Sequence, residues 1–577
     1  MFPKILNKNV DFKEEGTRGL GYKINIDFKA EEIKEFYIVF GVIENEEIDF
    51  ISNMKNDVFE NFDEFRNEID NKWNGLREMV NINVPSNKIN YVINNWFLYQ
   101  TIQSRLYAKS GYYQSGGANG FRDQLQDAIG IKYYDSNILK EQIIKCASKQ
   151  FKEGDVLHWW HEQTKKGVRT MFSDDLLWLV FAVYEYVIYE NDTSILFEEV
   201  EYLEGELLEN LNVLEKYDRY YSSLEKEIIF YHLKRAIDLV IKKGIDPFPK
   251  IGVGDWNDGF SNIGSKGKGE SIWLGFFFCD NLEKFINLYN RIESRLENKI
   301  DINYYQEIKE NLKKNLNTLG WDARWFKRAI TDDGEIIGSI NSKECKIDGL
   351  SQAWSVISNV ADNDKKYIAM EEAENHLIDK ENRIIKLFWP GFKNVEYNPG
   401  YIKAYPVGVR ENGGQYTHAA IWFILAEMLL GFDDKAYEYL EMINPITHSE
   451  NQERLSRFKL EPYVMYADLY SNMDMVSRGG WNWYTGSSAW YIKIVLEYLL
   501  GIKIEDGFIK FLPHIPSFWD NFEISFKYKS SKYNFFVKKK KSFSEPSKRV
   551  YINGREHFGN EIKIQNDGKI YNIEFFM

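Results

Sequence analysis

Helical periodicity from Ile89 to about Leu500 is the feature that most constrains the fold of this chain. Long loops rich in Gly, Trp, Asp and Asn separate the helical segments. Roughly a dozen helices in one uninterrupted region form either a solenoid or a closed toroid. No repeat of fixed period is visible, so we expect a helical toroid with its functional loops at one end. The amphipathic stretches are 89–108, 137–151, 174–190, 223–243, 271–297, 303–316, 349–361, 364–378, 415–430 and 487–500.

Both ends of the chain have β-strand patterns instead. Tyr22–Phe28 alternates apolar and polar residues, and Phe36–Phe40 is a continuous apolar run. Two or three strands cannot close a sandwich, so we expect residues 1–50 to be the tail of a β-domain. Residues 51–88 are predicted to be a helical linker, 89–500 the helical barrel and 501–577 a small all-β domain. Its expected strands are Phe508–Phe511, Phe522–Tyr528, Tyr533–Val537, Arg549–Asn553 and Lys569–Phe576.

Bulk composition excludes several classes of protein. The chain has 577 residues, of which 44% are apolar, which predicts two or three well-packed domains. The net charge of -14 argues against nucleic acid or an anionic membrane as partner. Three isolated cysteines form no metal or disulfide pattern, and no apolar run is long enough to span a bilayer. We therefore expect a soluble cytoplasmic protein. The 16% of aromatic residues fits either sugar-stacking surfaces or large cores.

The loop Gly254–Gly259, with sequence GDWNDG, has the strongest catalytic composition. Flanking glycines exclude a regular helix. If the loop is extended, Trp256 and Asp258 point one way, and Asp255 and Asn257 the other. A carboxyl beside an indole ring is partly desolvated, which raises its pKa and suits a general acid. A turn whose carboxylates cap backbone amides explains these residues equally well.

Two further loops carry groups that suit sugar binding. Gly120–Asp127 contains an Arg-Asp pair and further polar groups that can bind sugar hydroxyls, or that form a surface ion pair at a helix start. In His158–Trp160, the adjacent tryptophans suit stacking on a pyranose ring. The residues Ser173–Asp175 that follow are more simply an ordinary helix start, with Ser173 as N-cap.

Two loops at predicted helix starts could bind an anion. Arg410–His418 places a histidine and an arginine where the helix dipole also favours negative charge. A capping histidine is the simpler alternative. Arg478–Ser487 supplies the Thr485 hydroxyl and backbone N–H groups, or is a glycine-rich turn with an ordinary cap. No nucleotide-binding, metal-binding or serine-hydrolase motif is present in the sequence.

Four of these loops, in this order, resemble the inverting phosphorylases of glycoside hydrolase family 94. They are Phe121–Asp127 (FRDQLQD), Gly254–Gly259 (GDWNDG), Val409–His418 (VRENGGQYTH) and Gly479–Gly486 (GGWNWYTG). The loops Asn398–Pro406 and Gly167–Thr170 are similar to the β-1,2-glucan branch. That branch includes the C-terminal module of cyclic β-1,2-glucan synthases.

The resemblance implies an (α/α)6 barrel between an N-terminal β-sandwich and a small C-terminal β-domain. It implies Asp258 as the general acid. The implied sugar-binding residues are Arg122, Asp123, Asp127, Trp256, Arg410, Glu411 and Trp483, and the implied phosphate-binding residues are His418, Thr485 and Gly486. An inverting hydrolase needs a second carboxylate to activate water. A phosphorylase needs an anion cradle instead, because phosphate is already a nucleophile.

The implied activity is inverting phosphorolysis of a β-linked gluco-disaccharide or oligosaccharide, with β-1,2 favoured, giving α-glucose 1-phosphate. Phosphate is the co-substrate, and no cofactor or metal is expected. The alternatives are an inverting hydrolase of the same fold and a non-catalytic carbohydrate-binding module of a split or larger glucan synthase. Family members carry a much longer N-terminal sandwich. We therefore expect most of that sandwich to be missing, and either a homodimer or association with a separately encoded N-terminal part.

Overall fold

The computed structural model describes residues 10–14, 20–24, 29–33, 61–111, 114, 116–539 and 549–577. The chain divides into two compact units, Met1–Asn74 and Gly75–Met577. In the first unit, strands β1 (Val10–Glu14) and β2 (Leu20–Ile24) pair antiparallel. Helix α2 (Phe62–Met79) begins in this unit. The strand expected at 36–40, and 25–28 of the preceding one, lie outside the described residues.

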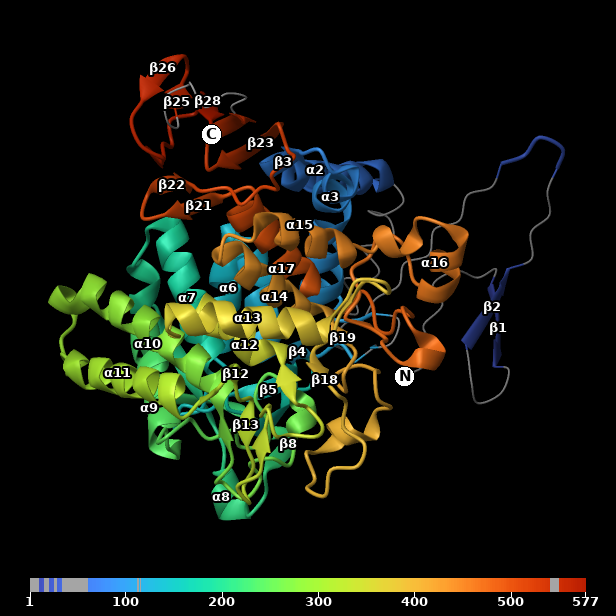
Figure 1. Ribbon diagram of the computed structural model, residues 1–577. Helices are drawn as coiled ribbons and strands as arrows, with labels where there is room; N and C mark the ends of the chain where they lie inside the picture. The colour runs from blue at the N-terminus through green and yellow to red at the C-terminus, as the bar shows by residue number, and fades with distance from the viewer. Residues whose placement is uncertain are drawn as a thin grey trace. The chain divides into compact units, whose positions relative to one another are not determined.

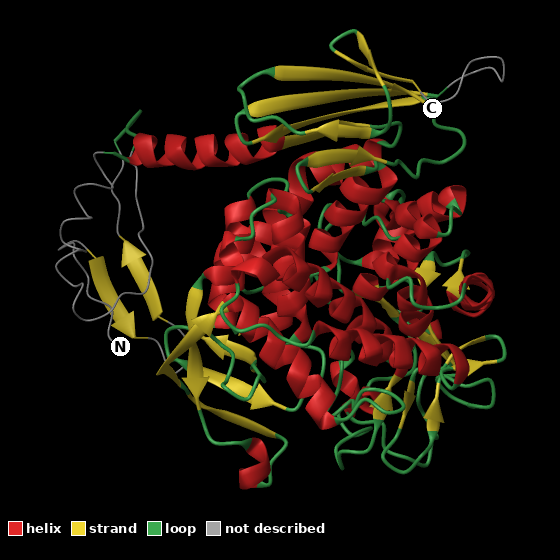
Figure 2. Ribbon diagram, turned by 90° about the vertical axis from the view of Figure 1, so that its left-hand side faces the viewer, coloured by secondary structure: helices red, strands yellow, loops and turns green. Residues whose placement is uncertain are grey.

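The helices of the second unit form a closed double ring, which confirms the predicted toroid (Figures 1 and 2). Each inner helix contacts the next, and the last contacts the first. The inner ring is α5 (Phe121–Gly130), α7 (Leu177–Glu190), α10 (Ile272–Ile292), α12 (Gly349–Ile357), α14 (Thr417–Leu429) and α17 (Ser487–Ile494). The outer ring is α4 with η4 (Phe97–Gln100 and Thr101–Tyr107), α6 (Ser136–Ala147), α9 (Ile229–Lys243), α11 (Ile302–Thr318), α13 (Asn363–Leu377) and α15 (Asp433–Met442).

Sequence pattern decides which helices are inside. Helix α14 is apolar on nearly all sides and is buried from Thr417 to Met428. Outer helix α11 has a narrow apolar stripe and buries little beyond Leu312 and Leu316. Tryptophans fill the centre of the ring, where Trp422 lies 5.2 Å from Trp354 and 5.5 Å from Trp490 between ring centroids. These aromatic residues therefore build the core.

Short strands lead into four of the inner helices. Strands β4 (Asn119–Gly120), β10 (Glu270–Ser271), β15 (Ile347–Asp348) and β19 (Gln415–Tyr416) directly precede α5, α10, α12 and α14. Their partners are other loop segments, including β13 (Ala329–Ile330), β18 (Phe388–Trp389) and β20 (Asp468–Leu469). These pairings fix the entry into each helix, so the loops at this end are held by backbone hydrogen bonds.

The region 157–228 contains strands that the helical prediction missed. Strands β5 (Leu157–His161), β6 (Lys166–Thr170) and β8 (Glu215–Arg219) continue from β4 as one sheet. Strand β9 (Tyr221–Ile228) pairs with β7 (Glu199–Glu204), so the predicted helix over 223–243 is wrong before Ile229. The charged sequence of β9 permits either state, and pairing with β7 decided it.

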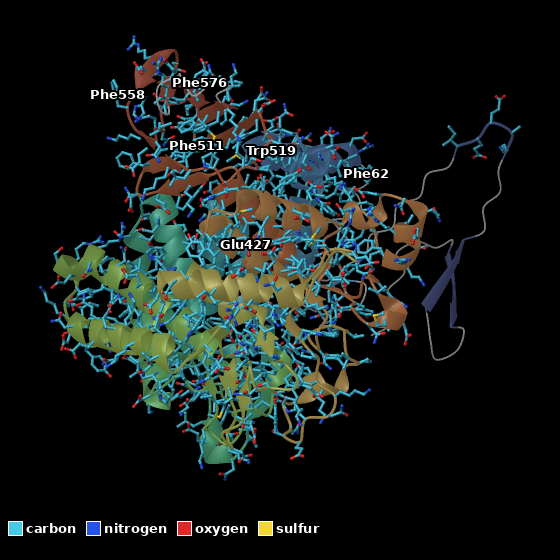
Figure 3. All side chains as sticks on the ribbon, viewed as in Figure 1. Phe62, Glu427, Phe511, Trp519, Phe558 and Phe576 are labelled. Atoms are coloured by element: carbon cyan, nitrogen blue, oxygen red, sulfur yellow. The ribbon has the colours of Figure 1, made fainter. Side chains whose placement is uncertain are left out.

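The C-terminal region is all-β, as predicted. Its six-stranded sheet has the order β26-β25-β28-β24-β23-β3, and β21-β22-β27 form a second sheet. Phe511, labelled in Figure 3, packs between the sheets, 4.6 Å from Phe575 and 5.1 Å from Phe535 between centroids. The strands are β21 (Ile502–Glu505), β22 (Phe508–Phe511), β23 (Asn521–Tyr528), β24 (Ser531–Lys538), β25 (Arg549–Ile552), β26 (Arg555–His557), β27 (Glu561–Lys563) and β28 (Ile570–Phe576).

The linker prediction for 51–88 is wrong at its end. Strand β3 (Val80–Asn83) is paired with β23 at the edge of the C-terminal sheet. Val80 and Ile82 alternate with exposed neighbours and are buried. Four residues are too few for the apolar–polar alternation to identify a strand by itself. Pairing with β23 makes this segment a strand. Among the described helices, none is long and apolar enough to cross a bilayer.

Candidate active site

A cavity of about 520 Å³ lies at the end of the barrel where the inner helices begin. Its lining comes from the starts of α5, α14 and α17 and from the loops that precede α10 and α14. All the predicted site residues except Asp127 and Trp483 line it, namely Arg122, Asp123, Trp256, Asp258, Arg410, Glu411, His418, Thr485 and Gly486. Loops far apart in sequence thus meet in one place.

The alternation expected in the loop Gly254–Gly259 is confirmed. Trp256 and Asp258 line the cavity, whereas Asp255 and Asn257 are fully buried behind it. Arg328 donates from Nη2 to Asp255 Oδ1 at 2.6 Å and from Nη1 to Asp255 Oδ2 at 2.7 Å. The same Nη2 donates to Asn257 Oδ1 at 2.9 Å. Both side chains on the buried face therefore serve to fix the loop.

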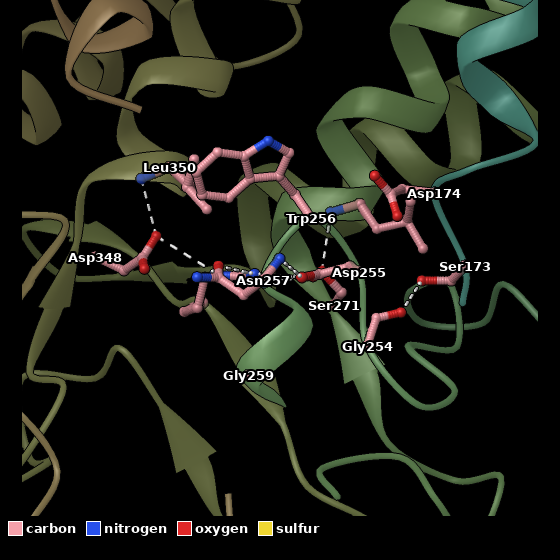
Figure 4. A network of polar contacts seen from close by, with 12 residues as sticks. Ser173, Asp174, Gly254, Asp255, Trp256, Asn257, Gly259, Ser271, Asp348 and Leu350 are labelled. Carbon is pink, nitrogen blue, oxygen red and sulfur yellow. Dashed lines mark hydrogen bonds and ion pairs between the residues drawn. The ribbon is translucent and has the colours of Figure 1, made fainter. Parts of the chain in front are cut away.

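Arg328 connects this loop to the starts of two inner helices. Its Nη1 also donates to Ser271 Oγ, which caps α10 by accepting from Leu274 N. Its Nε lies 3.6 Å from Asp348 Oδ1. Asp348 caps α12 by accepting from Leu350 N, as Figure 4 shows. Arg328 belongs to no motif and lies 73 positions after Asp255, so no pattern in the sequence points to it.

Arg122 holds the cavity face of the same loop. Its Nη1 donates to the carbonyl of Asp255 at 2.8 Å and its Nη2 to that of Trp256 at 3.3 Å. The Nη2 group also pairs with Asp258, and Nη1 donates to Asp174 Oδ1 at 2.7 Å. Arg122 thus positions Asp258 both directly and through the backbone.

The interpretation of Ser173–Asp175 as an ordinary helix start is wrong. Helix α7 begins only at Leu177, and Ser173 Oγ donates to the carbonyl of Gly254 instead. Asp174 and Asp175 turn towards the cavity wall, where they pair with Arg122. Asp174 also accepts from Trp178 Nε1 at 3.1 Å, so its carboxylate joins Arg122 to the first turn of α7.

Asp258 is less enclosed than the sequence suggested. Its side chain is 37% exposed, and Arg122 is its ion-pair partner. The neighbouring carboxyl of Glu411 is buried and accepts from Gly259 N at 3.1 Å. Burial, and then the charge of Asp258, raise the pKa of Glu411 to about 7. Asp258 faces the cavity, and the buried partner beside it holds a proton at or below neutral pH.

The three residues implied for phosphate converge at the start of α17. A Cβ added to Gly486 would lie 3.4 Å from His418 Nδ1 and 3.6 Å from Asp127 Oδ1. Thr485 Oγ1 contacts Ser487 Oγ at 2.8 Å. Burial lowers the pKa of His418 to about 3, so its imidazole is neutral in the folded protein. The positive charge considered for this histidine is therefore absent, and the cations near it are the arginines Arg105 and Arg122.

Arg105 is one of these arginines, and sequence analysis missed it. It lines the cavity, and its Nε donates to Asp127 Oδ2 at 2.8 Å. Its Nη2 lies 3.2 Å from Asp123 Oδ1. Burial raises the pKa of Asp127 to about 7 against the opposing charge of Arg105. Asp127 thus lies behind the lining, as the partner of Arg105.

Trp483 also lies outside the lining, where its Nε1 donates to Glu461 Oε1 at 3.2 Å. Trp481 lines the cavity in its place, and the Arg410 guanidinium carbon is 4.5 Å from the Trp481 ring centroid. Trp483 has a φ of 62°, so the backbone departs from an extended conformation there and the two tryptophans do not share one face.

The loop His158–Trp160 contributes one tryptophan and one cation. Trp159 lines the cavity, whereas Trp160 is buried in the core. His158 Nδ1 lies 2.7 Å from Asp175 Oδ2. Burial alone would lower the pKa of His158, but Asp175 and then Asp258 outweigh it and raise the pKa to about 9. No group of three or more His, Cys, Asp and Glu side chains within the described residues could hold a metal ion.

Comparison with known proteins agrees with this geometry. The catalytic domain of the glycosyl hydrolase 94 superfamily matches residues 72–501. The chain belongs to this superfamily. It is 37% identical over 478 residues to the cyclic beta-(1,2)-glucan synthase NdvB of Rhizobium meliloti, a match that covers 82% of this chain. It is 26% identical to solabiose phosphorylase of Paenibacillus borealis and 25% identical to N,N'-diacetylchitobiose phosphorylase of Vibrio proteolyticus, over 87% and 84% of this chain.

The matched region is only part of each relative. It spans 17% of the glucan synthase, 61% of the solabiose phosphorylase and 60% of the chitobiose phosphorylase. This chain therefore spans less than two thirds of the length of each of these relatives.

Proposed function

We propose that this chain is an inverting glycoside phosphorylase that cleaves a β-linked glucose disaccharide or oligosaccharide with inorganic phosphate. The observation that carries the proposal is the convergence in one cavity of Asp258 with His418, Thr485 and Gly486. A carboxyl group and an anion cradle in one site fit an acid and an anionic nucleophile. The phosphorylases among the relatives support the same reaction class.

In the proposed reaction, phosphate oxygen attacks the anomeric carbon as the glycosidic bond breaks. Asp258 donates its proton to the departing glycosidic oxygen, and Arg122 holds Asp258 in place. The Thr485 hydroxyl, the Gly486 backbone and the neutral His418 orient the phosphate on the opposite face of the sugar. Attack from that face inverts the configuration and yields α-glucose 1-phosphate. Glu411 lines the cavity beside Asp258 and is placed to hydrogen-bond the sugar.

The favoured linkage is β-1,2. The support is the 37% identity to the cyclic beta-(1,2)-glucan synthase, compared with 23–26% for the phosphorylases with other substrates in their names. A panel of β-1,2, β-1,3 and β-1,4 glucose disaccharides with phosphate tests this choice. Exclusive turnover of the β-1,4 substrate would refute it.

Incubation with β-1,2-oligoglucans, with and without phosphate, separates the proposed function from its alternatives. Sugar phosphate formed only when phosphate is present supports the phosphorylase. Reducing sugar released without phosphate would indicate an inverting hydrolase. Binding without any turnover would indicate a carbohydrate-binding module of a larger synthase. This alternative is supported by the match to only 17% of the cyclic beta-(1,2)-glucan synthase. Assembly as a homodimer or with a separate N-terminal part is also part of the proposal, and sedimentation of the isolated chain measures it.

A further inference from the structure

One wall of the cavity continues into the exposed sheet β4-β5-β6-β8. Gly120 of β4 and Trp159 and His161 of β5 line the cavity. Strands β6 and β8 extend the sheet beyond it. A cavity of about 520 Å³ has the size of a small-molecule site, so a longer sugar chain has to leave it along one of its walls.

A row of directly opposed residues crosses this sheet. Gly120 pairs with Trp159, Trp159 with Val168 and Val168 with Tyr217. Directly opposed residues of antiparallel strands project from the same face. The Trp159 and Tyr217 rings lie 5.3 Å apart between centroids at an interplanar angle of 35°, beside the nearly buried Val168. Two aromatic rings thus lead from the cavity wall onto the surface.

The Tyr217 side chain is too exposed to belong to the core. Its side chain is 51% exposed although it packs against a tryptophan. The adjacent row of the same sheet is polar, since His161 pairs with Lys166 and Lys166 with Arg219. Lys166 Nζ lies 5.7 Å from the Tyr217 ring centroid. An exposed aromatic surface beside hydrogen-bond donors suits a pyranose ring, which has an apolar face and a rim of hydroxyls.

We propose that Trp159 and Tyr217 form a platform for the glucosyl residues of an oligosaccharide that extend beyond the cavity. The occupant is a β-linked glucan of three or more units, because the platform is continuous with the wall that receives the scissile bond under the proposed function. The chain accordingly prefers oligosaccharides to disaccharides, and Tyr217 sets that preference.

Direct binding tests the platform without turnover. Calorimetric titration of the wild-type protein with linear β-1,2-glucans and β-1,4-glucans of two to five units, in the absence of phosphate, should show tighter binding with length in one series. Tyr217→Ala should weaken binding of the longer members about tenfold and leave disaccharide binding unchanged. Tyr217→Phe, which keeps the ring, should retain most of the gain.

Tyr221→Ala is the matched control. Tyr221 is also an exposed tyrosine, at 59%, but it belongs to β9, which pairs with β7 and not with this sheet. This variant should bind every oligosaccharide like the wild type, and all variants should unfold at the wild-type temperature.

The outcomes separate this inference from the proposed function on which it rests. If long glucans bind through Tyr217 but no sugar phosphate forms, the platform stands and the phosphorylase function falls. If the wild type turns over disaccharides but shows no gain in affinity with length, the platform is wrong and the function stands. The platform is also wrong if Tyr217→Ala keeps the full gain, or if the wild type binds neither series.

Discussion

The two faces of the loop Gly254–Gly259 are each held by one arginine. One of these arginines lies in the protein interior and the other lines the cavity. On the buried face, Arg328 and Asp255 are both fully buried, and every contact is internal to the protein. On the cavity face, Arg122 pairs with an Asp258 that is 37% exposed. The first pair has a single stable arrangement. Under the proposed function, the second pair has to separate when Asp258 donates its proton to the leaving group.

This difference implies that the buried pair contributes to stability and the cavity pair to turnover. Removing one member of a buried ion pair leaves an uncompensated charge in a medium that solvates it poorly. Removing the partly exposed carboxyl of Asp258 leaves Arg122 with Asp174 as its partner. Variants on the two faces should therefore separate the two quantities.

The largest expected effect is on turnover in Asp258→Asn. General acid catalysis contributes about 10²–10⁴ in rate, so kcat on an unactivated β-linked glucose disaccharide should fall by that factor. Activity should fall much less on an aryl glycoside with an acidic phenol, because that leaving group needs no proton. The unfolding temperature should stay near the wild-type value. Near-normal turnover of the disaccharide would refute Asp258 as the acid.

The second effect is on stability in Arg328→Ala. The free energy of unfolding should fall by about 3–5 kcal/mol, because Asp255 remains buried without its partner. Asp255→Asn should lower both stability and activity. Denaturant titration measures the change in stability, and the phosphorolysis assay measures the change in activity.

Arg324→Ala is the control for this pair. Arg324 forms a surface ion pair with Glu372 and is 53% exposed, so its loss should cost at most about 1 kcal/mol. Equal losses for Arg324→Ala and Arg328→Ala would contradict the structural role of the buried pair.

The third effect concerns the pH dependence of stability through Glu411. Its folded pKa, about 7, lies above the ordinary value of 4.5. Its contribution is therefore fully present below pH 4.5 and is lost as the pH rises through 7, because the folded site resists ionisation. In Glu411→Gln this decline should be absent, a difference of at most about 3 kcal/mol. Thermal unfolding from pH 4.5 to 8 measures it.

Glu453→Gln serves as the comparison, since the Glu453 side chain is 73% exposed. Its stability profile should follow the wild type over the whole pH range. A Glu411→Gln profile that runs parallel to the wild type would show that Glu411 ionises normally in the folded protein.

The smallest effect is expected in Gly486→Ala. The added methyl group would lie 3.4 Å from His418 and would narrow the place proposed for phosphate. The φ angle of -69° at Gly486 suits alanine, so stability should change by less than about 0.5 kcal/mol. The KM for phosphate should rise about tenfold while the KM for sugar stays constant. An unchanged KM for phosphate would show that Gly486 does not contribute to phosphate binding.

Local pattern alone predicted much of this molecule. Apolar spacing predicted ten of the twelve ring helices and missed α5 and α15. Inner helix α5 is half polar and is nevertheless buried, so its place in the ring depends on the groups packed around it. Alternation predicted that Trp256 and Asp258 share one face, since that relation depends only on neighbouring backbone geometry. The resemblance of four loops to the family 94 phosphorylases, and not local pattern, indicated which segments meet at one end.

Tertiary structure decided what depends on contacts across the chain. Arg328, Arg105 and Tyr217 carry no local signal, because each acquires its role from a partner far away in sequence: Asp255, Asp127 and Trp159, respectively. The segment Val80–Asn83 likewise becomes a strand because it pairs with β23, which is far away in sequence. Sequence by itself determined most of the ring helices and the composition of the loops, since these follow from short-range geometry. Only the fold decided which charges are buried in pairs and which remain open to the cavity, because desolvation depends on everything packed around a group.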